Sequence, residues 1–393
     1  MKDFASVKLP AMLPTDADRA LLVGRVWRVE DVHGPAVVVL RHGEVIDITA
    51  HAPTMSHLLD RGDVLVIVRN APGESLGQLA DLLVAGDAGG TRLLAPCDIQ
   101  AVKACGVTFA VSLLERVIEE QAKGDPTRAN DLRAEIQNII GTDLSSIVPG
   151  SPEAEALKLD LTARGLWSPY MEVGIGPYAE VFSKSQPMSS VGYGDDVGLH
   201  ADSHWNNPEP EIVLAVNGRG EVLGATLGND VNLRDIEGRS ALLLGKSKDN
   251  NASCAIGPFI RLFDEHFTMD TVRNAEVRML IEGEDDGFVL EGASYMQEIS
   301  RDPMELVAHT YGAHHQYPDG FVLFMGTMFS PIKDRDAAGG GFTHHMGDRV
   351  SISSPALGTL VNHVQRSDQL PPWTFGVRAL FENLARRGLL KTA

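Results

Sequence analysis

Three acidic residues near the middle of the chain have the types and spacing of a metal site. Only Pro210 separates Glu209 from Glu211, and Asp230 follows after two apolar runs. In an extended segment residues i and i+2 point to the same side, so Glu209 and Glu211 can direct two carboxylates at one point. Hard oxygen donors suit Mg²⁺, Mn²⁺ or Ca²⁺ better than zinc, which usually recruits His or Cys. The pattern predicts a divalent-metal enzyme.

The neighbours of these acids favour a buried site over a solvated surface, which is the usual place for acidic residues. Glu211 leads directly into the apolar run 212–216, so the acidic pair stands where a strand enters the core. We expect Asp230 in a turn just after another such run, between Asn229 and Asn232.

Arg234 and Lys246 both lie within sixteen residues of Asp230. Lys246 follows Leu242-Leu243-Leu244-Gly245, and this apolar approach would desolvate its ammonium group, lower its pKa and let it carry a proton. The Gly-Lys-Ser at 245–247 is not a phosphate-binding loop, because position 240 is Ser where that loop requires Gly.

Composition limits the possible partners. A net charge of -19 argues against nucleic acid and anionic membranes, which would repel this surface. No stretch approaches the roughly 18 apolar residues of a membrane span, and the N-terminus lacks an apolar signal core. Cys97, Cys105 and Cys254 are few and widely spaced, as expected for small buried residues of a cytoplasmic protein.

The chain is long enough for one large and one small domain. Short β-rich runs fill residues 20–95, and the runs 37–40 and 45–48 predict a hairpin. A Gly-rich stretch, 85–90, ends this region. We therefore predict a β-rich scaffold domain over residues 1–95 and a catalytic domain over 96–393.

The catalytic domain is expected to begin with helices and continue with strands. Helical periodicity starts after Phe109 and recurs at about 128–140 and 152–162, which predicts a helical insertion over 116–168, a possible lid. Glu119 and Glu120 could face the site, since residues i and i+4 share a helix face, but we expect them at a solvated edge of the first helix. From residue 181 onward short strands dominate, as in a roll or barrel, and they are expected at 212–216, 222–226, 277–281, 287–290 and 320–325. The fold class is α+β, mostly β.

Several motifs in order resemble the fumarylacetoacetate hydrolase family, from about Gly106 to Asn362. Glu209-Pro210-Glu211 resembles the family's Glu-x-Glu metal pair. The segment 229–237 is similar to its Asn-Asp-x-Ser-Ala-Arg-Asp-x-Gln motif. Gly245-Lys246-Ser247, followed by Gly257-Pro258, and later Gly326-Thr327 match further family motifs.

The resemblance implies a β-roll catalytic domain, usually a homodimer, with Mg²⁺ (or Mn²⁺) on Glu209, Glu211 and Asp230. It also implies that a 2-keto acid is contacted by Arg234, Lys246 and Thr327. The segment that contains Ser183 and Lys184 would approach the substrate's hydroxyl groups.

Two departures from the family pattern bear on the reaction. Hydrolytic members use a His in Gly-x-Asn-Tyr-x-x-His-x-x-Glu to activate water, and here Ser112 replaces that His while Glu115 remains. A Ser hydroxyl does not titrate near neutral pH, so hydrolysis of a carbon–carbon bond is disfavoured and Ser112 is left as a substrate contact. Glu237 stands where the family usually has Gln, which adds an acid near the substrate.

A metal, a Lys and a Glu without a water-activating His suit a dehydratase. Mg²⁺ chelated by a 2-keto acid stabilises the enolate formed when C3 loses a proton, and this enolate can expel a C4 hydroxyl. The chain resembles the family's 2-keto-3-deoxy-pentonate dehydratases of non-phosphorylative D-xylose or L-arabinose oxidation, which form 2-oxoglutarate semialdehyde. In our hypothesis Lys246 is the base and Glu115 the acid, although the sequence also allows the reverse.

Other functions remain open at this stage. They are hydrolysis of an acylpyruvate, decarboxylation or tautomerisation of an oxaloacetate-like acid, and a non-catalytic sugar-acid-binding protein. His200 and His204 could line the mouth of the site. The pairs at 314–315 and 344–345 are unsuited to one ion, because adjacent side chains of a strand point to opposite faces.

Overall fold

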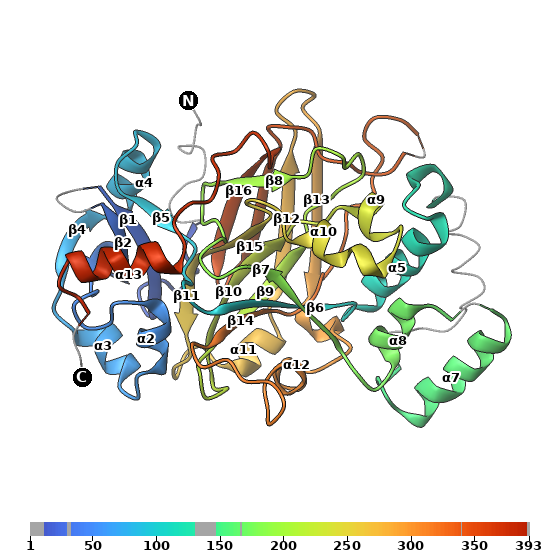
Figure 1. Cartoon of the computed structure of the whole chain (residues 1–393), viewed down its shortest axis with the longest axis horizontal. Coiled ribbons are helices and arrows are strands. Elements are labelled where there is room, and N and C mark those ends of the chain that lie inside the picture. Colours follow the sequence, from blue (N-terminus) through green and yellow to red (C-terminus); the bar gives the residue numbers. More distant parts are fainter. Residues whose placement is uncertain (1–11, 30–32, 130–146, 166, 339, 391–393) are drawn as a thin grey trace.

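The structure is a computed structural model that describes residues 12–29, 33–129, 147–165, 167–338 and 340–390. It contains two β-sheets at the centre, N-terminal strands and helices at one end, and helices of the expected insertion at the other (Figure 1). Strands predominate over short helices, which confirms the α+β, mostly β class. No helix in the described ranges is long and apolar enough to span a bilayer.

The larger sheet has eleven strands. They are β1 Leu22–Arg28, β2 Gly34–Arg41, β3 Glu44–Asp47, β4 Glu74–Gln78, β5 Arg92–Leu94, β6 Ala101–Gly106, β7 Glu180–Ser185, β9 Pro210–Val216, β10 Val222–Asp230, β11 Cys254–Leu262 and β14 Phe321–Phe324. Their order is β4-β3-β2-β1-β11-β10-β9-β14-β6-β7, with β5 on β1. Every residue of β9 and β11 is buried, so the sheet is covered on both faces at its middle.

The smaller sheet has five strands in the order β13-β12-β15-β16-β8. They are β8 Asp196–Leu199, β12 Glu276–Glu282, β13 Val289–Tyr295, β15 Arg349–Ser354 and β16 Gly358–Arg366. Buried and more exposed residues alternate along β12, as expected for a strand with one face on a core. Strand β12 packs against β9, and β15 and β16 pack against β10, so the main core lies between the two sheets.

The helices are short. They are α2 Met55–Asp60, α3 Val64–Asn70, α4 Leu79–Asp87, α5 Ala110–Ala122, α7 Pro152–Ala163, α8 Pro169–Ile175, α9 Arg234–Glu237, α10 Leu244–Lys248, α11 Met269–Arg273, α12 Pro303–Thr310 and α13 Val377–Arg386, with 3₁₀ turns at η3 Ala241–Leu243 and η4 Met296–Glu298. Apolar residues of α2 and α3 cover the larger sheet on the face turned away from the main core.

Most of the expected elements are present. The hairpin is β2 and β3, joined at His42 and Gly43, which both have positive φ as a two-residue hairpin turn requires. The expected strands at 212–216, 222–226, 277–281 and 320–325 correspond to β9, β10, β12 and β14. The run at 287–290 was placed too early, because Gly287 belongs to a turn and β13 extends to Tyr295.

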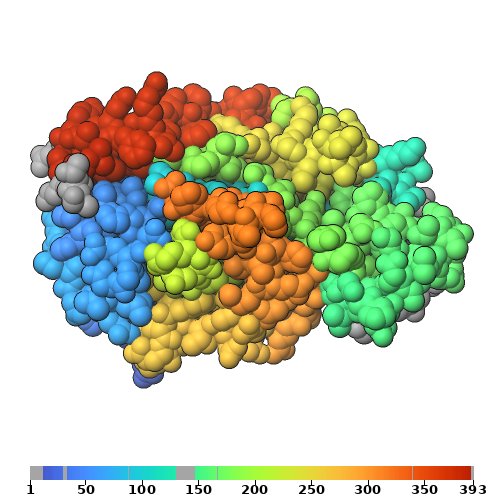
Figure 2. Space-filling model, turned by 60° about the horizontal axis from the view of Figure 1, so that its bottom comes forward, coloured from blue at the N-terminus to red at the C-terminus, as the bar shows by residue number. Residues whose placement is uncertain are grey.

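The predicted N-terminal domain shares its sheet with the rest of the chain. Strand β1 pairs with β11, so the hydrogen-bonded ladder continues across the expected boundary at residue 95. Helix α13 also returns to this region and packs on β2. Figure 2 shows the N-terminal and C-terminal parts in contact on one face of the molecule. A division at residue 95 stays a prediction.

The helical insertion is present in part. Helices α5, α7 and α8 pack around one apolar cluster that includes Leu113, Leu161 and Met171. The helix expected at about 128–140 lies almost entirely outside the described residues. Whether residues 116–168 move as a lid also stays a prediction.

Candidate metal centre and active site

The three acidic residues meet at one end of the neighbouring strands β9 and β10. The antiparallel register places Glu211 opposite Gly228, and the Asp230 amide donates to the Glu209 carbonyl at 3.0 Å. One oxygen of each carboxylate lies within 4.8 Å of the others. The turn expected at Asp230 is wrong, because Asp230 is the last residue of β10 and pairs with Cys254 of β11.

The carboxylates are almost completely buried, with exposed fractions of 1%, 0% and 1% for Glu209, Glu211 and Asp230. The Gly326 amide donates to Glu211 Oε2 at 2.7 Å, whereas Glu211 Oε1 has no hydrogen-bond partner among the described residues. Burial, together with Asp230 and Glu209, raises the pKa of Glu211 well above its ordinary value. A buried carboxylate oxygen without a donor beside two more carboxylates fits a hard divalent cation.

Three cationic side chains surround this trio. Lys248 Nζ lies 2.5 Å from Glu209 Oε2 and 3.2 Å from Asp230 Oδ2, and Lys184 Nζ lies 2.9 Å from Asp230 Oδ1. Arg116 contacts Glu209 Oε1. Burial opposes ionisation of Glu209, but Arg116 and Lys248 outweigh it and lower its pKa to about 2. The ammonium of Lys248 therefore stands between two carboxylates that could hold a metal.

The lysine expected at the site lies elsewhere. Lys246 is exposed and contacts His200, with 3.3 Å between their side-chain nitrogens. Leu242 is 94% exposed, so the apolar run before Lys246 does not bury it, and the expected desolvation is wrong. With 3.6 residues per turn, positions two apart in α10 face opposite ways, so Lys248 points to the carboxylates and Lys246 does not.

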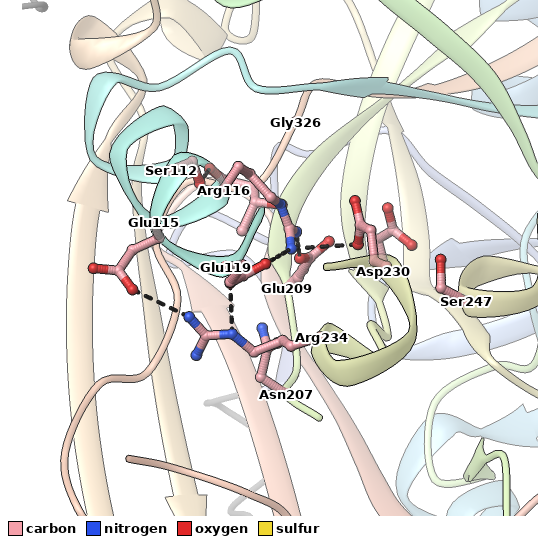
Figure 3. Close-up of polar contacts among 12 residues, drawn as sticks. Ser112, Glu115, Arg116, Glu119, Asn207, Glu209, Asp230, Arg234, Ser247 and Gly326 are labelled. Carbon is pink, nitrogen blue, oxygen red and sulfur yellow. Dashed lines mark hydrogen bonds and ion pairs between the residues drawn. The ribbon is translucent and has the colours of Figure 1, made fainter. Parts of the chain in front are cut away.

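Helix α5 contributes a second charged network beside the first. Arg234 Nε lies 2.6 Å from Glu119 Oε1, and Arg234 Nη2 lies 3.1 Å from Glu115 Oε2. Figure 3 shows Glu115 and Asp230 at opposite sides of the group, with Arg116 and Glu209 between them. Glu119 is 1% exposed, so its expected position at a solvated edge is wrong. The acids of α5 are buried because Arg116 and Arg234 neutralise them.

A cavity of about 10 Å³, room for about one water molecule, borders the carboxylates. It is lined by Cys105, Gly106, Val107, Ser112, Arg116, Glu180, Phe182, Glu209, Asp230, Glu237, Lys248 and Thr327. Three residues expected to bind substrate, Ser112, Glu237 and Thr327, are thus at the site. Glu115, Lys246 and Arg234 do not line it.

The two remaining expected substrate contacts, Ser183 and Lys184, are neighbours on β7 and therefore point to opposite faces of that strand. Lys184 is fully buried, points to Asp230 and also donates to the carbonyls of Val231 and Lys248. Ser183, the preceding residue of β7, is exposed and accepts a hydrogen bond from Lys103. The structure therefore brings Lys184 to the metal ligands but leaves Ser183 on the opposite face of β7.

Glu180 is a site residue that the sequence did not reveal. It pairs with Gly106 across strands β6 and β7, and its carboxylate covers that glycine so closely that a Cβ there would lie 1.8 Å from Glu180 Oε2. Burial, and the nearby Glu237, raise the pKa of Glu180 to about 7. A carboxyl group with such a pKa can exchange protons at neutral pH. Only its position at the start of a strand marked it in the sequence.

Comparison with known proteins gives a match for the part of the chain that holds most of this site. Residues 177–365 match the family model described as fumarylacetoacetate (FAA) hydrolase, C-terminal. Over these residues, just under half of the chain, the protein matches this domain. This domain contains Glu180, Lys184, Lys248 and the three acidic residues, whereas α5 precedes it. The alignment of Ser112 with the family's His therefore stays a prediction.

Two curated relatives and a solved structure are similar to the chain. A probable 2-keto-3-deoxyxylonate dehydratase of Haloferax volcanii is 33% identical over 195 residues, which cover 50% of this chain and 63% of the relative. A 2-dehydro-3-deoxy-D-arabinonate dehydratase of Saccharolobus solfataricus is 30% identical over 190 residues, 48% of this chain and 59% of the relative. The chain thus spans about three fifths of the length of each.

The solved structure is a 2-keto-3-deoxy-D-arabinonate dehydratase complexed with magnesium and 2,5-dioxopentanoate. It has a TM-score of 0.58 at 20% identity, over 88% of this chain and 99% of that one. At this identity the likeness shows a shared fold.

Proposed function

We propose that this protein catalyses the metal-dependent dehydration of a 2-keto-3-deoxy-pentonate to 2-oxoglutarate semialdehyde, also called 2,5-dioxopentanoate. The observation that carries the proposal is the composition of the cavity. It combines two of the three carboxylates that fit Mg²⁺, Glu209 and Asp230, with a lysine and a carboxyl group of raised pKa, and no His lines it among the described residues. This set suits proton transfer at a 2-keto acid better than activation of water.

Mg²⁺ would be held by Glu209, Glu211 and Asp230, and Mn²⁺ is an alternative. When bound, it would supply Lewis-acid chemistry at the carboxylate and keto oxygens of the acid. Lys184 keeps Asp230 in place from its other side, because its ammonium is fixed by two backbone carbonyls.

Lys248 is the base in this proposal, in place of Lys246. Its Nζ is within 3.2 Å of two ligand carboxylates, so it reaches a group bound next to them. Burial lowers the pKa of its ammonium, but Asp230 and Glu209 outweigh burial and raise the pKa above its ordinary value. Lys248 must therefore give up its own proton first, and in that neutral form it removes a proton from C3. Glu180 is the acid, in place of Glu115, because it lines the cavity whereas Glu115 is paired with Arg234. It protonates the C4 hydroxyl, which leaves as water when the C4–O bond breaks.

Ser112 does not act as a base for hydrolysis in this proposal. Its hydroxyl donates to the Thr327 carbonyl at 2.7 Å and so holds the start of α5 against the segment that follows β14. The elimination leaves a C3–C4 double bond. Removal of a proton from C5 and its return to C3 then give the C4–C5 enol, and this enol becomes the aldehyde when C4 gains a proton and the C5 hydroxyl loses one.

The relatives support the D series of substrates. The 2-keto-3-deoxy acids derived from D-xylonate and D-arabinonate are one compound, because C4 is the sole stereocentre left after oxidation at C2 and loss of the C3 hydroxyl. The proposal therefore names this compound first and its enantiomer, the L-arabinonate-derived acid, second. A place in pentose oxidation, a cytoplasmic location and a homodimer, implied by the family resemblance, belong to the same proposal.

The test is a coupled assay in which an added aldehyde dehydrogenase reports the semialdehyde. Both enantiomers and an acylpyruvate are offered to the enzyme with Mg²⁺ and with EDTA. We expect product from the D compound, and only in the presence of Mg²⁺. Cleavage of the acylpyruvate with no semialdehyde from either enantiomer would replace the dehydratase with a hydrolase. Metal-dependent binding of the sugar acid without turnover would indicate a sensor.

A further inference from the structure

Arg116 lies on α5, before the matched domain, yet its side chain contacts residues of that domain. Its guanidinium lies 2.7 Å from Glu119 on α5 and 3.3 Å from Glu237 on α9, and it also contacts Glu209 at the start of β9. The residue is only 6% exposed. Figure 3 shows Arg116 reaching from α5 to Glu119 and Glu209. One side chain thus joins three elements.

The two oxygens of Glu209 have different partners. Lys248 Nζ bridges Glu209 Oε2 and Asp230 Oδ2, so these two oxygens face a common point. Glu209 Oε1 points the other way, to Arg116. The contact with Arg116 therefore lies on the side of the Glu209 carboxylate away from Asp230.

We propose that Arg116 is a positioning residue that holds the Glu209 carboxylate from outside and thereby sets the affinity for the divalent metal. The proposal rests on the metal site of the proposed function. Glu119 and Glu237 fix the guanidinium, and the guanidinium fixes Glu209. Partners that orient a ligating carboxylate typically change metal affinity by about 10- to 100-fold.

An arginine suits this position because of its shape. The planar guanidinium offers five donors and can contact carboxylates on several sides, whereas a lysine ammonium is a single point charge. A purely electrostatic role predicts the opposite result. If Arg116 only competed for the charge of Glu209, its removal would strengthen metal binding, because a cation beside a ligand repels the incoming ion.

The experiment is calorimetric titration of the EDTA-stripped full chain with MgCl₂ and with MnCl₂. The variants are Arg116→Gln, Arg116→Lys and Glu119→Gln. Arg261→Gln is the matched control, since Arg261 is also a buried arginine, 2% exposed, but is bonded to Asp16 and to the Ala356 carbonyl. Thermal melting of each variant establishes that it is folded.

We expect Arg116→Gln to raise Kd about 10- to 100-fold, with a smaller increase for Arg116→Lys and for Glu119→Gln, and a change within about 2-fold for Arg261→Gln. Turnover lost in Arg116→Lys should return at saturating metal, because the substitution impairs only the positioning of Glu209. An unchanged or tighter Kd in the Arg116 variants would overturn the proposal. If Arg116→Gln does not fold, Arg116→Lys and Glu119→Gln decide by the same criterion.

The metal-binding test of Arg116 can be distinguished from the test of the dehydratase reaction. If the wild type binds metal but forms no semialdehyde, the dehydratase proposal fails and the role of Arg116 stands or falls on the Kd values. If the wild type binds neither metal, both proposals fail.

Discussion

The choice between two lysines of one short helix decides which side chain can do chemistry. Lys248 is 2% exposed and lies against two carboxylates, whereas Lys246 is exposed. The spacing rule for Glu209 and Glu211 succeeded because strands have a fixed period of two residues. No comparable rule predicts which face of a five-residue helix points to the site. The sequence analysis therefore chose Lys246 where the structure has Lys248 beside the carboxylates.

The first prediction compares these lysines by substitution. Lys248→Met should lower kcat by about 10²-fold or more, the contribution typical of a positioned proton carrier. Lys246→Met should lower it far less, because its ammonium is at the surface beside His200. Steady-state kinetics at saturating Mg²⁺ measures both. A larger loss in Lys246→Met would restore the assignment made from the sequence.

Gly106 provides a test of Glu180 that leaves its carboxyl group in place. A Cβ at position 106 would lie 1.8 Å from Glu180 Oε2, the end of a flexible side chain, so Gly106→Ala should fold but displace the carboxylate. We expect a loss of kcat similar to that of Glu180→Gln. Gly245→Ala, at a position open to solvent, is the control. Full activity of Gly106→Ala would argue against Glu180 as the acid.

Among the elements, the segment after β14 is tied to the turn between β12 and β13 by one histidine. His345 Nδ1 lies 2.9 Å from Asp285 Oδ2 in that turn, and His345 Nε2 lies 2.9 Å from Asp336 in the segment. A neutral imidazole has a single N–H and cannot donate to both carboxylates. The ring must be charged to make both contacts. The other charged groups near the His345 ring are Arg335, Asp286 and Asp348, which belong to the same turn and segment. His344 hydrogen-bonds to Asp348.

This contact predicts a pH-dependent contribution to stability. Partial burial disfavours the charged ring, but Asp285 and Asp336 outweigh it and raise the pKa of His345 above its ordinary value. The contribution is therefore fully present below the unfolded pKa, about 6.5, and is lost as pH rises through the folded pKa. Urea unfolding should show His345→Asn less stable than wild type at pH 5.5 and nearly equal at pH 9. His314→Asn, at an exposed position, should match wild type at both. A deficit in His345→Asn that does not change with pH would contradict the charged contact.

The elements themselves were largely predictable. Apolar runs bounded by Gly and Asp gave the strands of both sheets, and the period of 3.6 residues gave α5 and α7. The acids on α5 were harder. Glu115 and Glu119 have the spacing of a solvated helical edge, and Arg234, distant in sequence, pairs with both in the interior. A local pattern cannot show such a partner.

At the scale of the whole molecule, the sheet continues where the composition suggested a boundary. The sequence showed a change from hairpins to helices near residue 95, but pairing of β1 with β11 depends on strands far apart in the chain. Helix α13 reinforces this union: Asn383 donates to the His33 carbonyl at 2.7 Å, and Arg387 to the Pro35 carbonyl at 2.6 Å.

This arrangement predicts that α13 stabilises the N-terminal strands without affecting the site. Leu384 is 1% exposed, so Leu384→Ala should cost about 2–5 kcal/mol of unfolding free energy. Denaturant unfolding measures the loss, and kcat of the folded variant should stay near that of wild type. Phe381→Ala, at a position 47% exposed on the same helix, should cost much less. A loss of kcat in folded Leu384→Ala would show that α13 is coupled to the site.

The central claim is that Glu209, Glu211 and Asp230 hold a divalent metal required for dehydration. The most direct measurement is semialdehyde formation by EDTA-treated enzyme from 2-keto-3-deoxy-D-xylonate as MgCl₂ is added, for wild type and for Glu211→Gln. The account predicts no product before addition, a saturable return of activity in the wild type, and none at the same concentrations in Glu211→Gln. Full activity in EDTA, or equal recovery of the variant, would contradict it.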